Sequence, residues 1–96
     1  MSAHPYATVG CFEDKGDRAI DWITRFVSID SCYRAAKEKG FHVFAAQRRS
    51  DCRGDSSAAK MFDKYGKSSV CTADGTGGAW ANQVYIIKGK GKGENC

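Results

Sequence analysis

The apolar and polar positions along the chain predict at least three β-strands. Residues 6–12 alternate weakly and are rich in strand-forming residues, which predicts a first strand. Residues 41–47 are the predicted central strand by composition, and residues 83–87 are expected to close the sheet. Residues 19–27 are apolar but lack a clean period, so they fit either a further strand or an irregular run that packs its large side chains.

Residues 28–40 carry the clearest helical pattern of the chain. Ser28 or Asp30 can cap the first turn, because either side chain accepts a hydrogen bond from an unpaired backbone N–H. Gly40 is expected to end the helix in the left-handed conformation that glycine adopts easily. The predicted apolar face repeats at i, i+3, i+4 and i+7 and consists of Ile29, Cys32, Tyr33 and Ala36.

Two further segments follow the predicted central strand. Residues 50–59 have the composition of an exposed polar loop. Residues 58–65 predict a helical turn that ends at Gly66.

The length of the chain indicates a single small domain. A chain of 96 residues can bury only a modest core. The domain is expected to span residues 6–88, with a disordered N-terminus over residues 1–5 and a flexible basic tail over residues 89–96. Five cysteines are present without a CxxC pair, and His4 and His42 do not have zinc-ligand spacing. Disulfides in an oxidising compartment are therefore expected, with a reduced cytosolic chain as the alternative.

The positions of the cysteines suggest two bonds. Cys32 lies on the apolar face of the predicted helix and Cys52 follows the central strand, so a helix packed across the sheet brings them together. Cys11 then pairs with Cys71, and a Cys11–Cys96 bond is the main competing arrangement. Cys96 is left over on the tail, either as an intermolecular disulfide that links a dimer or as a thiol without a role.

Charge and hydropathy restrict the class of partner. The net charge is +4, with lysine and arginine spread along the chain, so no nucleic-acid partner is expected. The KGKGKG tail allows contact with sulfated glycans or acidic surfaces by charge alone, although such a tail is more often a solvated end. No apolar run reaches membrane-spanning length, and the first ten residues do not form a signal peptide. A secreted chain is therefore expected to be a mature form with an added initiator methionine.

Catalytic and metal-binding signatures are missing from the sequence. No zinc-protease, nucleophile-elbow or phosphate-loop motif occurs, so a non-enzyme without cofactor is expected. His42 is expected to be a structural residue within a strand, and the Asp14–Asp17 and Asp51–Asp55 carboxylate pairs are expected to be solvated turns. Residues 74–78 could offer oxygens to Ca²⁺, but their glycines are also explained by turn chemistry.

Two short motifs suggest binding. Arg53, Gly54 and Asp55 form the integrin-recognition tripeptide directly after Cys52, in the predicted exposed loop, although chance also produces such a tripeptide.

The second motif is compatible with carbohydrate binding, because an indole stacks on the apolar face of a sugar while amides bond its hydroxyls. The alternative is that Trp80 is a core residue over the end of the sheet and that Asn82 fixes the turn. The set consists of Trp80, Asn82, Gln83 and Tyr85.

Several segments together resemble a cysteine-containing module of secreted and matrix proteins from marine invertebrates, over residues 6–88. They are GCFEDKGDRAI near the start, the cysteine helix ending in glycine, FAAQ before Cys52, FDKYGKSSVC, and DGTGGAWANQVYII. More distantly, the GCF start and the helix–strand disulfide resemble WSC and PAN/apple domains. That resemblance implies a helix on a curved antiparallel sheet and a non-catalytic module that binds carbohydrates or proteins. The chain departs from the marine module at Ala79, where proline is usual, and has fewer cysteines than WSC domains.

The sequence therefore predicts a secreted α+β domain with one main helix on a curved antiparallel sheet and two disulfides. A lectin-like module that binds a glycan or a cell-surface or matrix glycoprotein is the leading hypothesis. The alternatives are a cell-adhesion or matrix protein that binds integrin through Arg53, Gly54 and Asp55, and a venom or defence component.

Overall fold

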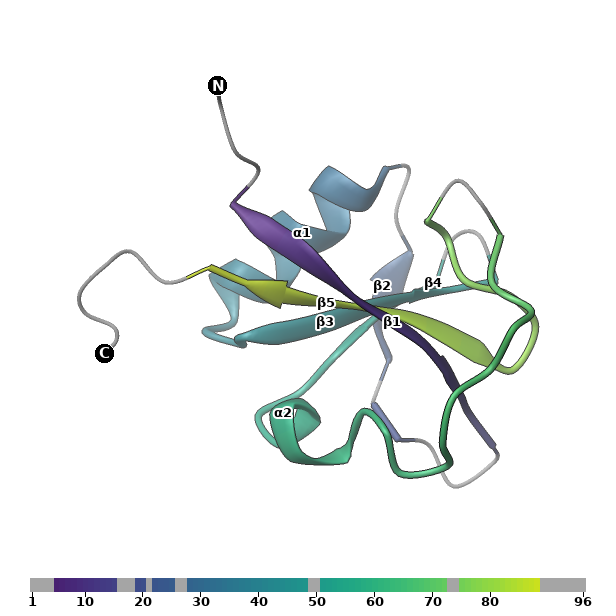
Figure 1. Cartoon of the computed structure of the whole chain (residues 1–96). Helices are drawn as coiled ribbons and strands as arrows, with labels where there is room; N and C mark the ends of the chain where they lie inside the picture. Colours follow the sequence, from purple (N-terminus) through teal and green to yellow (C-terminus); the bar gives the residue numbers. More distant parts are fainter. Residues whose placement is uncertain are drawn as a thin grey trace.

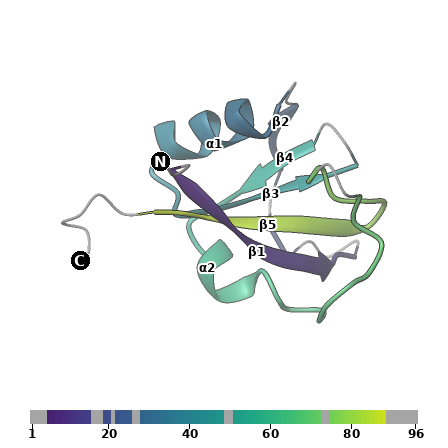
Figure 2. The ribbon, with the colours of Figure 1, turned by 45° about the horizontal axis from the view of Figure 1, so that its top comes forward.

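The computed structural model describes residues 5–15, 19–20, 22–25, 28–48, 51–72 and 75–88. Within them, five antiparallel strands form one sheet in the order β1-β5-β3-β4-β2. One main helix, α1, lies on one face of the sheet, and the short α2 lies on the other (Figures 1 and 2). The α+β prediction is confirmed. In chain order the elements are β1 Tyr6–Glu13, β2 Trp22–Arg25, α1 Ile29–Glu38, β3 Val43–Gln47, β4 Asp51–Gly54, α2 Ala58–Met61 and β5 Ala81–Ile87.

The α1 helix begins and ends where the sequence predicts. Ser28 is the N-cap: its side-chain oxygen accepts a 3.1 Å bond from the Ser31 backbone N–H, and Ser31 Oγ accepts a 3.2 Å bond from the Ser28 N–H. Gly40 has a φ of +80° and donates its N–H to the Lys37 carbonyl at 2.9 Å. Three of the four predicted apolar positions, Cys32, Tyr33 and Ala36, are buried against the sheet.

The face of the sheet beneath α1 has an aromatic core. Phe44 is fully buried and stacks on Tyr85, with ring centroids 5.0 Å apart. Tyr6 closes this core with edge contacts to both rings. Burial, together with the charge of Asp30 and the nearby Tyr33, raises the pKa of the Tyr6 phenol. The buried members of this core are Cys32, Tyr33, Ala36, Phe44, Ala46, Cys52 and Tyr85.

The opposite face, on the α2 side, has a second core. Because side chains alternate along a strand, Val43 and Ala45 of β3 point to this face while Phe44 and Ala46 point to α1. All five β3 residues are therefore buried, which confirms the central-strand prediction. The buried apolar members are Phe12, Ala19, Ile20, Val43, Ala45, Ala58 and Val84.

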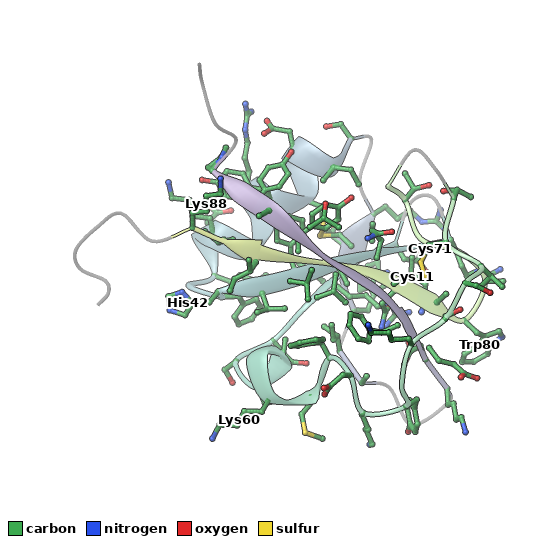
Figure 3. All side chains as sticks on the ribbon, viewed as in Figure 1. Cys11, His42, Lys60, Cys71, Trp80 and Lys88 are labelled. Carbon is green, nitrogen blue, oxygen red and sulfur yellow. A yellow bond between two sulfur atoms is a disulfide. The ribbon has the colours of Figure 1, made fainter. Side chains whose placement is uncertain are left out.

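Both disulfides expected from the sequence are present. Cys32 of α1 is bonded to Cys52 of β4, with 5.4 Å between their Cα atoms. Cys11 of β1 is bonded to Cys71, with 6.0 Å between their Cα atoms, and the two are seen together in Figure 3. Each bond thus joins a strand to a segment outside the sheet. The tail expected to be flexible, residues 89–96 with Cys96, lies outside the described residues, as do residues 1–4 of the N-terminus expected to be disordered over residues 1–5.

Three strand predictions need correction or completion. The polar loop expected over residues 50–59 is wrong, because Asp51–Gly54 forms β4 between β3 and β2. The closing strand begins two residues earlier than expected, at Ala81. The ambiguous run at residues 19–27 contains the edge strand Trp22–Arg25. The short α2 covers only Ala58–Met61 of the predicted helical turn.

Candidate functional site

A surface hollow of about 280 Å³ lies between β2, the end of β4 and the C-terminal end of α1. Its lining combines one exposed indole, two half-buried apolar side chains and one charge of each sign. The lining residues are Trp22, Ile23, Lys39, Phe41, Gly54 and Asp55. Ile23 and Phe41 also pack against the α1-side core, so the hollow is where that core reaches the surface.

An irregularity in β2 explains how two consecutive residues line the same hollow. In a regular strand Trp22 and Ile23 would point to opposite faces. The register between β2 and β4 shifts between Trp22 and Thr24, as at a β-bulge. β2 is also the last strand of the sheet, so its outer side has no neighbour in the strand order. The Trp22 side chain is consequently 54% exposed while Ile23 is half-buried.

Gly54 forms the closely packed floor of the hollow. A Cβ atom at this position would lie 2.8 Å from Ile23 Cδ1 and 3.1 Å from Phe41 Cδ2. The Ile23 and Phe41 side chains thus pack directly against the backbone of Gly54, where a larger residue would not fit. The floor is apolar. The apolar face of a sugar ring, or another flat apolar group, can pack on it next to the indole.

The rim of the hollow carries a hydrogen-bond donor and an acceptor. Lys39 is the exposed C-cap residue of α1, and its backbone N–H bonds the carbonyls of the last turn. Asp55 Oδ1 accepts hydrogen bonds from the Ser57 N–H at 2.9 Å and from Ser57 Oγ at 3.0 Å, which hold the carboxylate in place. A polyhydroxyl ligand can accept from the first group and donate to the second.

The integrin-recognition tripeptide does not form the exposed loop expected from the sequence. Arg53 is a β4 residue and only 5% exposed. Its Nε donates to Gln47 Oε1 at 3.3 Å and its Nη1 to the Ile20 carbonyl at 3.3 Å. Nη2 lies 3.7 Å from Asp51 Oδ2. Gly54 is buried in the floor of the hollow, so Asp55 is the one residue of the tripeptide whose side chain lines it.

A buried polar cluster occupies the α2 side of the sheet next to Arg53. Gln47 Nε2 donates to Asp14 Oδ2 at 2.8 Å and to Asn82 Oδ1 at 3.1 Å. Asp14 Oδ1 accepts from the Ala19 N–H at 2.9 Å. Asp14 is 2% exposed, so the expectation of a solvated turn carboxylate is wrong for it. The cluster is enclosed and joins the residue after β1 to β3, β4 and β5.

The four residues of the sequence-predicted carbohydrate set do not share a surface. Asn82 is fully buried in the polar cluster on the α2 side. Tyr85 lies in the α1-side core, where its hydroxyl donates to the Gly75 carbonyl at 2.7 Å. Gln83 is half-buried between β1 and β3. Alternation along β5 separates Asn82 from Tyr85, and this set is wrong as a single site.

Trp80, the fourth residue of that set, is not a core residue. Its side chain is 48% exposed, so the alternative expectation of a buried Trp80 is also wrong. It has a φ of +56°, and its carbonyl accepts a 2.8 Å bond from the Asp14 N–H. Figure 3 shows it at the end of the molecule where Cys11 and Cys71 lie, far from His42 and Lys88.

Sequence reasoning missed Trp22 as a candidate ligand-binding residue. Its strand is a short apolar run without regular alternation, which gives no indication of which side chains point outward. The one signal that pointed to Trp22 was the irregular period of this run. Such irregularity is typical of an edge strand with a β-bulge, and a bulge commonly redirects side chains. His42 was expected inside a strand, but it is exposed and precedes β3, with its carbonyl accepting from the Ile87 N–H at 2.8 Å.

Three other expectations concern metal ions, calcium and membranes. Among the described residues, no three histidine, cysteine, aspartate or glutamate side chains gather as a metal ion would require. Asp74, considered as a calcium ligand, lies outside those residues. Across the same part of the chain, no helix has the length and apolar character needed to span a bilayer.

Comparisons with known proteins do not assign the chain to a family. A scan against protein-family models gave no match, and a search of curated proteins gave none either.

Proposed function

We propose that the chain is a secreted, non-catalytic module that binds carbohydrate in the hollow at Trp22. The observation that carries this proposal is a half-exposed indole beside Ile23 and Phe41, which pack on Gly54, with one cationic donor and one anionic acceptor on the rim. Sugars present one apolar face and a ring of hydroxyls, so they need this combination of stacking and directed hydrogen bonds. The target is the sugar part of a free glycan or of a cell-surface or matrix glycoprotein.

The size of the hollow favours a short part of a glycan. Pockets for drug-sized ligands have volumes of about 300–1,000 Å³. The hollow, at about 280 Å³, lies just below that range and therefore suits the end of a chain better than an enclosed oligosaccharide. The sugar ring stacks on Trp22, its hydroxyls accept from Lys39 Nζ, and others donate to the Asp55 carboxylate.

The disulfides support the extracellular and family parts of the proposal. Bonds such as Cys11–Cys71 and Cys32–Cys52 persist in oxidising compartments and are consistent with an extracellular protein. The helix joined by a disulfide to an antiparallel sheet is consistent with the proposed fold of the PAN/WSC type. No adhesion function through the tripeptide is proposed, because the Arg53 side chain is buried and bonded within the sheet.

A glycan array tests the proposal with a matched pair of variants. Trp22→Ala removes the stacking surface and is expected to lower binding at least tenfold, as loss of an aromatic anchor typically does. Trp80→Ala removes an equally large and similarly exposed indole elsewhere and is expected to change binding by less than twofold. Circular dichroism confirms that both variants fold. Absence of specific array binding by the wild type, or a Trp80→Ala loss equal to that of Trp22→Ala, contradicts the proposal.

A further inference from the structure

We propose that the chain also binds sulfated polysaccharide, through a second surface that is independent of the hollow at Trp22. This lysine surface lies where the end of β1 meets the segment after α2. Two exposed lysines, Lys15 and Lys64, lie at the half-buried ring of Tyr65 and define it. Two further exposed lysines, Lys60 and Lys67, belong to the same segment of the chain as Lys64.

Two ammonium groups are drawn to the same ring. Lys15 Nζ lies 5.0 Å and Lys64 Nζ 5.2 Å from the centroid of Tyr65. Each contact is attractive, because the ring face is electronegative, and together they keep two like charges close despite their repulsion. On α1, for comparison, Lys37 Nζ lies 5.8 Å from the centroid of Tyr33. The ring of Tyr65 thus brings two positive charges to one place on the surface.

The backbone beneath these lysines is fixed by long-range contacts. Lys67 forms an isolated antiparallel bridge with Phe12, and the Gly66 carbonyl accepts from the Glu13 N–H at 2.9 Å. Phe62 packs edge-on against Phe12, with 5.0 Å between ring centroids. The Cys11–Cys71 bond closes the same pair of segments four residues further along. A surface held in this way loses little conformational entropy when it binds.

The charge balance of the surface fits a polyanion. Within the described residues 13–15 and 60–67, four exposed lysines outnumber two exposed carboxylates, Glu13 and Asp63. Lys60 is on α2, and its side chain extends away from the sheet at the lower left of Figure 3. Several cations on one rigid surface bind a chain of anions by releasing its counterions, and no single contact needs to be strong.

Sulfated polysaccharide fits better than nucleic acid for two reasons. Single-stranded nucleic acids bind strongly where aromatic rings are open for base stacking. The ring of Tyr65 is half-buried and already carries both ammonium groups, whereas sulfates require only the cations. The disulfides are also consistent with an extracellular setting, where the polyanions met are mainly polysaccharides.

Heparin is the probe for the test, and its binding is measured as a function of sodium chloride. The double variant Lys15→Gln/Lys64→Gln removes both charges at Tyr65. Near 0.15 M salt it is expected to bind heparin at least tenfold more weakly than the wild type. The slope of log K against log salt should become shallower by about two, one unit for each lost contact.

The matched control is Lys37→Gln/Lys88→Gln, which removes the same charge from exposed positions outside the lysine surface. It is expected to lose less than threefold. Trp22→Ala should bind heparin as the wild type does, so failure of the lysine surface and failure of the hollow are distinguishable. Equal losses in the two double variants overturn the proposal, as does no heparin binding by the wild type at low salt. Tighter binding of poly(dT), or equal binding of unsulfated hyaluronan, overturns the assignment to sulfated chains.

Discussion

The two tryptophans of the chain differ in surroundings far more than in exposure. Trp22 is 54% exposed and Trp80 is 48% exposed. Trp22, however, lies in a hollow with an apolar floor and a charged rim, whereas Trp80 lies on a turn with its carbonyl bonded to the Asp14 N–H. An exposed aromatic ring therefore indicates a binding site only when the neighbouring groups complete the chemistry of a ligand.

The two regions are also held differently. The hollow at Trp22 extends the α1-side core, in which the Cys32–Cys52 bond joins helix to sheet. The turn at Trp80 depends on backbone geometry: Trp80 and Gly77 both have positive φ, and Gly77 packs against the carbonyl of Ala46. Disturbing the turn should thus change stability without changing ligand binding.

The largest expected effect follows removal of the disulfide at the Trp80 end. Cys11→Ser/Cys71→Ser opens a loop with a sequence separation of 60 and should lower the free energy of unfolding by about 4 kcal/mol in the chain-entropy model. Cys32→Ala/Cys52→Ala, with a separation of 20, should lose about 3 kcal/mol from the same term. Urea denaturation measures both. Under conditions where the Cys11→Ser/Cys71→Ser variant remains folded, its glycan affinity should equal that of the wild type. A loss of affinity there would show that the two regions are coupled.

A glycine substitution near Trp80 should have the next largest effect. Gly77 has a φ of +76°, and a Cβ atom there would collide with the Ala46 carbonyl oxygen and lie 2.8 Å from the Ala81 oxygen. Gly77→Ala is expected to lower the free energy of unfolding by about 3 kcal/mol, from backbone strain and displacement of the turn.

Gly40→Ala is the control for backbone strain alone. Gly40 has a φ of +80° but no atom within 4 Å of a built Cβ, so this variant should lose only about 1 kcal/mol. Equal losses in the two variants would mean that the close approach at Gly77 has no energetic importance.

The rim of the hollow should show the smallest effect, in binding and not in stability. Lys39→Gln removes the cationic donor and is expected to weaken glycan binding about fivefold, which corresponds to about 1 kcal/mol. Lys37→Gln changes the same charge on the same helix outside the hollow and should leave the affinity unchanged. Isothermal titration calorimetry compares the two. An unchanged glycan affinity of the Lys39→Gln variant would show that Lys39 does not donate a hydrogen bond to the ligand.

Local signals in the sequence were sufficient for much of the fold. The capping residue Ser28, the apolar spacing of α1 and Gly40 determine one helix from adjacent residues, and the structure confirms each. The Cys32–Cys52 bond followed from placing a helix over a sheet, and Cys71 was then preferred over Cys96 as the partner of Cys11. These features depend on short-range chemistry or on a single long-range constraint.

β4 and the candidate site could not be predicted in the same way. Asp51 and Arg53 look like loop residues, and they form a strand because Gln47 and the Ile20 carbonyl accept from the Arg53 guanidinium within the fold. Trp22 becomes a site residue only through the register shift in β2 and the position of Lys39 at the end of α1. Both depend on non-local pairing, which composition does not specify.

Tryptophan fluorescence tests the central claim directly, because the chain contains two tryptophans. Trp80→Phe leaves Trp22 as the sole indole, and Trp22→Phe leaves Trp80. The saccharide with the strongest array signal is titrated into each variant. A saturable change in emission from Trp22 alone, at the affinity measured by calorimetry, is the predicted result. A change confined to the variant that retains Trp80 would contradict the assignment of the binding site to the hollow.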